Sequence, residues 1–487
     1  MLNILFTFAG RSLFMVAQHS TVCLLKGHTT ITVGKDNKML MPLEARRCFF
    51  ALLTIVVACT VTITISTLDG RRAHCSPAEK PDGQAGEGNR ATNDFSTIEG
   101  NLRSSRQSAK WGTDPQSGAH VVRLTSSPGR GHNIYCEQPY GSPDGQRIVF
   151  YQSGSPTWGP HKLVIAELSG LYTLTEIEPE LKSLSIAHSS WGEWAYYSME
   201  DGSIRRVSLL TLQRQAVLPA GSIDTSRQGF RSITPDNRWI IGTEWVKGAE
   251  ADGSPLKRCY ALDTRTGQQR VILQDPDNRN SHAQSELGNG GRWMYQLLVS
   301  PGRVPVFVRE LFGSADPVQL PFGGQWSAES TGHMAWIGTT GRVACAVQWD
   351  REARQHVPRH PDGNLLIAAP GDTKPQVFAA PEHGFYHVSI SRCGRYFVCD
   401  DWMDYEPTGI LDAKPGPIRI VIGNLKTGKY RVLIHDCQCY GLGSTAAFEP
   451  NPYMTADNRW VIYNGSPFGS TQVFAAKLRE DFLSSLD

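Results

Sequence analysis

The sequence predicts an all-β protein, a seven-bladed β-propeller preceded by a hydrophobic helix and a polar linker. Its 487 residues include 47 glycines and 29 prolines but only 19% charged residues, a composition that favours short strands and many turns. One pattern of a turn followed by a strand recurs along the chain. A chain of this length can still form one domain when the fold is all-β.

The N-terminal part of the chain predicts export. Residues 1–40 have no convincing periodicity and are treated as an N-terminal extension of uncertain structure. Residues 48–68 carry no charge and follow Arg46 and Arg47, so they can span a bilayer with the N-terminal side in the cytoplasm. We therefore expect 41–68 to be a signal peptide or a membrane anchor. A cleaved signal, an uncleaved anchor and a lipidated Cys59 remain open, with a buried core strand as the alternative.

Residues 69–109 are polar, rich in glycine, serine, proline and charge, and poor in aromatics. This composition predicts a disordered linker. The globular domain, 110–487, is then expected outside the cytoplasm, in a periplasmic or other extracytoplasmic location. Any contact with a membrane would be made through the N-terminal segment alone.

Composition and motifs also exclude several functions. The formal charge is only +2 and no block of Lys and Arg alternates with aromatics, so we expect no nucleic-acid partner. The eleven cysteines are scattered without a CxxC pair, which argues against a zinc ribbon and a dense disulfide framework. No nucleophile elbow or Walker loop is present, so a serine hydrolase or phosphate-binding site has no support. The sequence does not indicate an oligomeric state.

A turn followed by an alternating apolar strand recurs seven times. Asp-Gly, Asp-Asn and Thr-Gly pairs in these turns suit positive φ angles, and alternate residues of the next strand pack into a core. The copies lie at 142–150, 234–241, 288–295, 339–345, 391–398 and 455–463, with a degenerate copy at 191–197. Second hairpins at 260–273 and 420–433 complete four-stranded units, as in propeller blades. A pair of β-sandwiches is the structural alternative, but it gives no reason for the repeated turn.

Polar residues recur at matched positions before these turns. In a propeller the strand before such a turn is commonly the innermost one, so its start opens on the central channel. The residues at or near this position are His282, His333, His387, Arg231, Glu449 and Asn451, with His132 and Glu137 upstream of the first turn. We expect them to form a ring at one mouth of the channel, where they could serve as an acid–base or metal site.

Each of these residues also has a purely structural interpretation. A polar side chain on an inner strand is often a hydrogen-bonded spacer at a crowded axis. A local structural metal site of His387, Cys399 and Asp401 is conceivable, but no second close ligand pair accompanies it. We therefore interpret Cys393, Cys399 and Asp401 as blade structure.

From about Trp111 to its end, the chain resembles the TolB-like propellers and, among them, the oligogalacturonate lyase family. Ulvan-type lyase propellers are similar in architecture. The resemblance implies β-elimination at a uronic acid of an acidic oligosaccharide, as in pectin degradation. It implies His333 as the preferred base, His282 as a second polar contact or alternative base, and Arg231 as a clamp on the carboxylate. The segments that carry it are 133–135 with its turn at 142–145, 281–284, 332–336, His387 with its turn, 450–453 and 469–474.

The resemblance also implies a divalent metal, Mn²⁺, held by histidines and a glutamine. His387 matches one of the family's ligands, with His383 as an alternative. The family's His-Pro-His-Pro sequence has become 449–452 here, so Glu449 and Asn451 complete the expected metal group, whereas Ala446 stands at the glutamine position. A second hypothesis explains these replacements directly: a non-catalytic TolB-like propeller that binds a protein or glycan partner.

Overall fold

The computed structural model describes part of the chain, in two compact units, 1–90 and 91–487. In the first unit β1 (Leu2–Phe8), β2 (Arg11–Gln18), β3 (Thr21–Lys26) and β4 (Thr29–Ile31) form one antiparallel sheet in chain order. In the second unit the described segments are 95–106, 111–126, 129–153, 161–181, 185–246, 256–274, 281–285, 291–296, 305–322, 331–347, 362–402, 417–439, 449–467 and 470–487.

The expected signal or anchor, 41–68, lies outside the described residues, as does its hydrophobic segment 48–68. Within the described segments, no helix is both long and apolar enough to cross a membrane. Of the expected linker, residues 95–106 are described, and they belong to the second unit. The strand β5 (Arg103–Arg106) pairs with β11 (Thr173–Leu181), so this sheet extends N-terminal of the boundary expected at residue 110.

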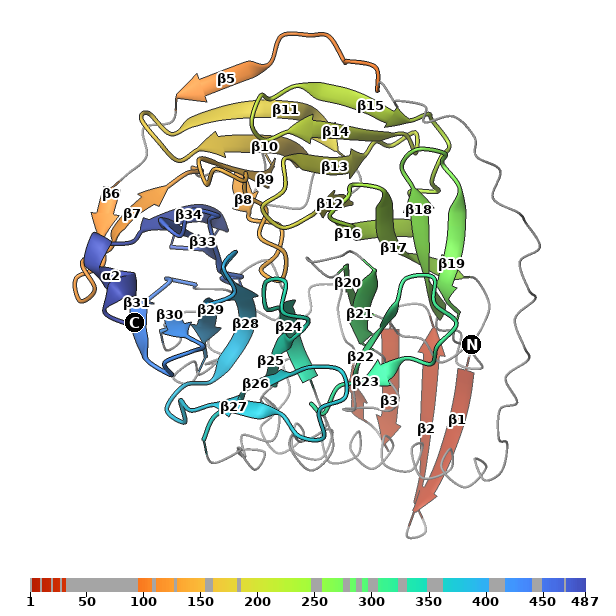
Figure 1. Ribbon diagram of the computed structural model, residues 1–487. Helices are drawn as coiled ribbons and strands as arrows, with labels where there is room; N and C mark the ends of the chain where they lie inside the picture. The colour runs from red at the N-terminus through yellow and green to blue at the C-terminus, as the bar shows by residue number, and fades with distance from the viewer. Residues whose placement is uncertain are drawn as a thin grey trace. The chain divides into compact units, whose positions relative to one another are not determined.

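The second unit is all-β and propeller-like, and its sheets lie around a common centre (Figure 1). The first sheet has the order β5-β11-β10-β9-β8, and the second has eight strands. A single parallel pair, His188 with Ser232, joins the two antiparallel halves of the eight-stranded sheet. The strands named here for the first time are β8 (Arg130–His132), β9 (Arg147–Ser153), β10 (His161–Glu167), β12 (Ile186–His188), β13 (Trp194–Ser198), β14 (Ile204–Ser208), β15 (Arg214–Leu218), β16 (Gln228–Ile233), β17 (Trp239–Val246), β18 (Leu256–Asp263) and β19 (Gln269–Leu273).

Three further sheets are four-stranded antiparallel meanders in chain order. Their strands are β20 (Ser281–Ser285), β21 (Arg292–Gln296), β22 (Val306–Glu310) and β23 (Val318–Gln319); β24 (Thr331–Trp336), β25 (Val343–Val347), β26 (Leu365–Ala368) and β27 (Gln376–Phe378); and β28 (Phe385–Ile390), β29 (Tyr396–Asp401), β30 (Arg419–Asn424) and β31 (Tyr430–Ile434). In Figure 1 the strands β12, β16, β20, β24 and β28 lie nearest the centre.

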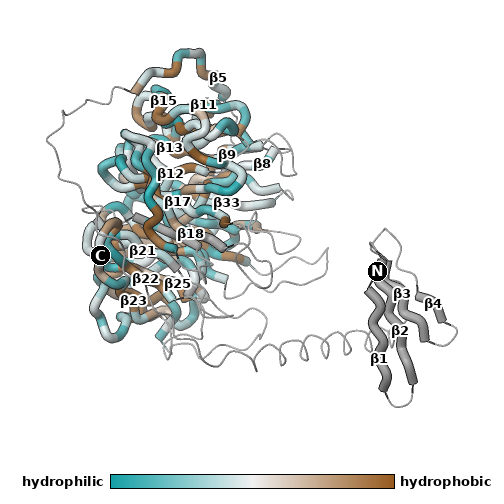
Figure 2. The backbone as a smooth tube through the Cα atoms, turned by 90° about the vertical axis from the view of Figure 1, so that its right-hand side faces the viewer, coloured by the Kyte–Doolittle hydropathy of each residue, from teal (hydrophilic) through white to brown (hydrophobic). Residues whose placement is uncertain are grey.

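The last sheet joins the two ends of the second unit. The strands β32 (Tyr453–Met454), β33 (Trp460–Gly465) and β34 (Gln472–Lys477) continue into β7 (His120–Arg123) and β6 (Trp111–Thr113). This pairing of late with early strands closes the ring, and α2 (Glu480–Ser484) follows it. Figure 2 shows apolar stretches concentrated in the strands of this unit, in keeping with the buried aliphatic and aromatic clusters between its sheets.

The repeated turns take the conformation that their residues suggest. In one of them the Thr455 hydroxyl donates to the Asp457 carboxylate at 2.7 Å, and that carboxylate accepts the Arg459 backbone N–H at 3.1 Å. Asn458 then has a φ of 56° and Gly394, in another copy, a φ of 70°. Residues that tolerate positive φ therefore stand in these two turns, between one strand and the next.

Four successive innermost strands, β16, β20, β24 and β28, are each interrupted at one place. The pairing register shifts between Phe230 and Ser232 in β16, between Ser281 and Gln284 in β20, between Thr331 and Met334 in β24, and between Phe385 and Val388 in β28. A bulge of this kind turns one side chain out of the regular alternation of a strand. The interrupted segments contain Arg231, His282, His333 and His387, the residues that the sequence predicts at the channel mouth.

Candidate functional site

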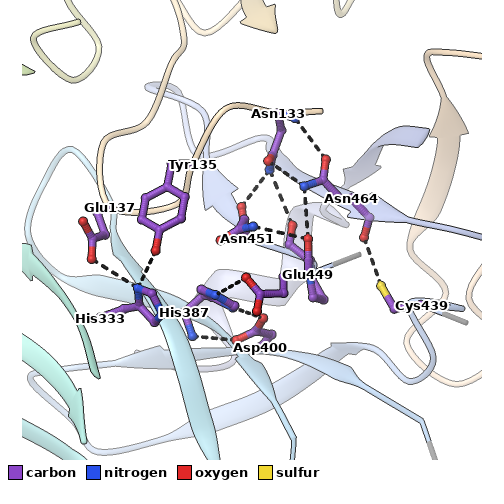
Figure 3. Close-up of polar contacts among 11 residues, drawn as sticks. Asn133, Tyr135, Glu137, His333, His387, Asp400, Cys439, Glu449, Asn451 and Asn464 are labelled. Atoms are coloured by element: carbon purple, nitrogen blue, oxygen red, sulfur yellow. Dashed lines mark hydrogen bonds and ion pairs between the residues drawn. The ribbon is translucent and has the colours of Figure 1, made fainter. Parts of the chain in front are cut away.

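A cluster of polar side chains lies where β24, β28 and the segments before β9 and β32 meet (Figure 3). His333 and His387 form its centre, with ring centroids 4.2 Å apart. Both are buried, His333 with 7% of its surface exposed and His387 with none. At this distance a positive charge on either imidazole needs a carboxylate nearby to stabilise it. Each of the two histidines has one.

His333 is held through its Nδ1 atom. That atom lies 2.8 Å from the Tyr135 hydroxyl and 3.3 Å from a carboxylate oxygen of Glu137. The amide of Gln284 donates to the other Glu137 oxygen at 2.7 Å, and the Met334 backbone N–H donates to the first one at 3.3 Å. Because an ionised carboxylate only accepts hydrogen bonds, it favours the tautomer of His333 with its proton on Nδ1 and its lone pair on Nε2.

Tyr135 lies between His333 and an arginine. The guanidinium of Arg231, an exposed residue in the β16 bulge, is 5.1 Å from the centre of the Tyr135 ring. Burial, followed by the nearby Glu137 carboxylate, raises the pKa of Tyr135 well above its ordinary value. The phenol therefore keeps its proton at neutral pH and can act as a hydrogen-bond or proton donor.

The segment that carries Tyr135 is strained and tightly anchored. Ile134 has a φ of 71°, which is an outlier for a β-branched residue. The preceding Asn133 exchanges two hydrogen bonds with Asn464, at 3.0 and 2.9 Å, and donates to the Asn451 carbonyl at 2.7 Å. This amide network fixes the Tyr135 segment against the segment that contains Asn451, so both sides of the cluster are set together.

His387 lies between two carboxylates. Its Nδ1 is 2.6 Å from Asp400, which also accepts the His387 backbone N–H at 2.6 Å. On the other side, Nε2 forms an ion pair with Glu449 at 3.2 Å. This contact is not a well-formed hydrogen bond, and Nε2 has no hydrogen-bond partner in the described segments. Burial lowers the pKa of His387, but Asp400 and Glu449 outweigh it and raise the pKa to about 9.

Five of the six site residues predicted from the sequence thus lie in or beside one cluster: His333, His387, Glu449, Asn451 and Arg231. His282 is on β20, next to the register shift, but its side chain lies outside the described residues. The alternative ligand His383 instead pairs with Asp401 at 2.8 Å, in a separate group that includes Arg419.

Sequence reasoning named Glu137 among the expected ring residues but did not pair it with a histidine, and it missed Tyr135 and Asp400 as histidine partners. Tyr135 stands in the 133–135 segment and Glu137 upstream of the first turn, so both were visible but without an assigned role. Asp400 stands beside Asp401 in β29, where a pair of acidic residues on a buried strand was the available signal.

The residues expected to bind a metal fit a divalent cation in part. In the described segments, no three His, Cys, Asp or Glu residues are grouped so that they could hold an ion. Nevertheless the Oδ1 atom of Asn451 is buried and has no hydrogen-bond partner there, and Nε2 of His387 faces Glu449. One imidazole nitrogen, one carboxylate and one amide oxygen are donors that Mn²⁺ accepts, and Asp400 orients the imidazole as carboxylates do in metal sites.

No protein-family model and no curated protein sequence matches the chain. Solved structures do. An oligogalacturonate lyase in complex with manganese is 17% identical, with a TM-score of 0.60, over 78% of this chain and 99% of that one. An oligogalacturonate lyase from Vibrio parahaemolyticus is 15% identical, with a TM-score of 0.59, over 80% of this chain and 99% of that one. TolB from Acinetobacter baumannii is 14% identical, with a TM-score of only 0.35, over 68% of this chain and 64% of that one.

The described fold and these matches place the chain among all-β, propeller-like proteins. Within that class its second unit has the fold of the oligogalacturonate lyases. At 15–17% identity the likeness concerns the fold, and the chemistry has to be argued from the side chains.

The His387–Asp400 pair predicts how stability depends on pH. Because the folded-state pKa of about 9 lies above the ordinary value of 6.5, the pair stabilises the fold fully below pH 6.5, and this contribution is lost as the pH rises through 9. Asp400→Asn should therefore lower the free energy of unfolding by on the order of 3 kcal/mol near pH 6, and by much less above pH 9.

Urea unfolding of the wild type and the variant at both pH values measures this difference. Asp481→Asn, which alters an exposed pair with Arg479, is the matched control and should change stability little at either pH. A loss for Asp400→Asn that is the same at both pH values would contradict the assignment of the charge to His387.

Proposed function

We propose that the protein is a lyase that cleaves uronate-containing oligosaccharides by β-elimination. The observation that carries the proposal is the arrangement at His333. Its imidazole has a buried carboxylate and a tyrosine hydroxyl at Nδ1, and an exposed arginine lies 5.1 Å from the ring of that tyrosine. The likeness in fold to oligogalacturonate lyases supports the same reaction class.

β-Elimination at a uronic acid requires a base, because the proton on the carbon next to the carboxylate must be removed. In the proposed mechanism Nε2 of His333 accepts this proton, and the Glu137 carboxylate stabilises the imidazolium that forms, as the aspartate does in hydrolase triads. Arg231 provides a positive charge for the uronate carboxylate, whose charge grows as the proton leaves. His282, on the neighbouring strand, is proposed as a second polar contact or alternative base.

A divalent cation, Mn²⁺ in the first instance, belongs to the proposal. His387, Glu449 and Asn451 would hold it, with Asp400 orienting the imidazole. When bound, such a cation neutralises a substrate carboxylate and makes the adjacent proton more acidic. The proton on His387 and the cation would compete for the same nitrogen atom, because a metal ligand must be the neutral imidazole.

The proposal extends to the setting of the protein. We propose an exported location with an acidic oligosaccharide as partner, in line with the hydrophobic segment 48–68. Dividing the eight-stranded sheet at its parallel pair would give seven blades, the number that the repeated turns predict.

A non-catalytic propeller that binds a glycan or protein is the second candidate. The observation in its favour is that His387 and Glu449 already form an ion pair with each other, and that the described residues contain no complete metal group. A scaffold of this kind would be indifferent to changes at His333.

The purified full-length protein should release an unsaturated product from uronate oligosaccharides, seen as an increase in ultraviolet absorbance. His333→Ala should lower kcat/KM by about 10²–10⁴-fold, because it removes the base. His120→Ala, which removes an exposed histidine at the start of β7, is the matched control and should leave the rate unchanged. Absence of product from galacturonate, ulvan and glycosaminoglycan oligosaccharides, with and without Mn²⁺, would leave the scaffold as the better account.

Binding of Mn²⁺ to the full-length protein, measured by isothermal titration calorimetry, tests the metal part. Glu449→Gln and Asn451→Ala should each weaken binding at least about tenfold, because the first removes the negative charge of a ligand and the second removes an oxygen ligand. Glu480→Gln, a change at the exposed start of α2, should have no effect. If the wild type binds no Mn²⁺, or if all variants bind it equally, the three residues are not the metal group.

A further inference from the structure

The contact between Tyr135 and His333 limits how a substrate can be processed. The Tyr135 hydroxyl and Nδ1 of His333 are 2.8 Å apart. The tyrosine ring packs edge-on against His333, with centroids 5.6 Å apart, while the Arg231 guanidinium lies 5.1 Å from it. The strained backbone at Ile134 and the anchored Asn133 hold the segment that carries it. The phenol therefore stays beside the imidazole.

Elimination needs a second proton movement besides the removal of the proton from the sugar. The sugar that leaves from O4 departs as a strongly basic alkoxide unless a group protonates it. In the tautomer that Glu137 favours, Nδ1 of His333 carries a proton and donates it to the Tyr135 oxygen, so this contact does not use the phenol proton.

We propose that Tyr135 is the general acid of the reaction, and that this protein cleaves uronides whose proton at C5 and oxygen at C4 lie on the same face of the sugar ring. These are the glucuronate and mannuronate configurations. The inference rests on the proposed lyase function and specifies its substrate class.

The stereochemical part follows from the position of the two groups. In galacturonate and guluronate, the C5 proton and O4 lie on opposite faces, so the base and the acid must stand on opposite sides of the ring. Two side chains joined by a hydrogen bond of 2.8 Å cannot have a sugar ring between them. In glucuronate and mannuronate both reacting atoms are on one face, where an adjacent acid and base reach them together.

The step balances within these two residues. The C5–H bond breaks and its proton moves to Nε2 of His333, the electron pair forms the C4–C5 double bond, and the C4–O4 bond breaks with its pair on O4. O4 takes the Tyr135 proton. The tyrosinate that results faces the imidazolium N–H of His333 and the charge of Arg231. Return of the Nδ1 proton to Tyr135, and proton exchange of His333 with water, restore the starting state.

Two pairs of epimers test the substrate class. All four test substrates are 4-linked. Oligomannuronate and oligoguluronate differ only in configuration at C5, whereas oligoglucuronate and oligogalacturonate of the same anomeric configuration differ only at C4. With the full-length protein and Mn²⁺, we expect kcat/KM for the same-face member of each pair to exceed that of its epimer by about 10²-fold or more. Faster cleavage of galacturonate or guluronate would overturn this inference and leave the lyase function standing. Cleavage of none of the four would remove both.

The acid role is tested with the leaving group. The Tyr135→Phe variant should cleave the same-face oligosaccharide about 10²–10⁴-fold more slowly than wild type. On a uronide of the same configuration with 4-nitrophenoxide at C4, which leaves without a proton, the loss should be under about threefold. Tyr453→Phe, which removes a buried hydroxyl without a hydrogen-bond partner in the described segments, should match wild type on both. Thermal unfolding of Tyr135→Phe should match that of Tyr453→Phe, which shows that the variant is folded. An equal loss of rate for Tyr135→Phe on both substrates, or no loss on either, would then overturn the role of Tyr135 as the acid.

Discussion

The interruption of pairing in successive innermost strands is the constraint on which the site depends. A regular strand sends neighbouring side chains to opposite faces, and in these sheets both faces are packed against other sheets. A register shift in β24 and another in β28 release one residue each from that alternation, so that His333 and His387 can meet with their rings 4.2 Å apart. The shifts in β16 and β20 lie at Arg231 and His282.

The two central histidines are given different properties by their partners. His387 is fully buried between Asp400 and Glu449, which holds a positive charge inside the protein. His333 has Glu137 and Tyr135 on the same nitrogen atom. His387 is thus a charged, fixed imidazole, whereas His333 beside it has its lone pair on Nε2. Because the two side chains are identical, their surroundings alone produce this difference.

Much of the fold can be predicted from the sequence because it depends on local rules. Turn pairs such as Asp457-Asn458 specify positive φ, and alternating strands such as β9 follow them. The edge strand β5 was not predicted, because Arg103–Arg106 is fully polar and its only signal is pairing with β11. The histidines could be located because they stand at matched positions before the turns, where each of their strands has one bulge.

The partners of the histidines could not be predicted in the same way. Tyr135 and Glu137 come from the segment between β8 and β9, 198 and 196 positions from His333, and no periodic pattern links segments so far apart. Asp400 is on β29, where a buried acidic residue is explained only by the imidazole it faces on β28.

A crystal structure of the full-length His333→Ala variant with oligomannuronate bound tests the central claim most directly. The account predicts one sugar at the cluster, with its C5 proton directed at the space left by the imidazole and its carboxylate toward Arg231. Its O4 should lie about 3 Å from the Tyr135 hydroxyl, on the same face as that proton. An oligosaccharide bound away from residues 135 and 333, or one whose O4 and C5 proton face opposite walls of the site, would contradict it.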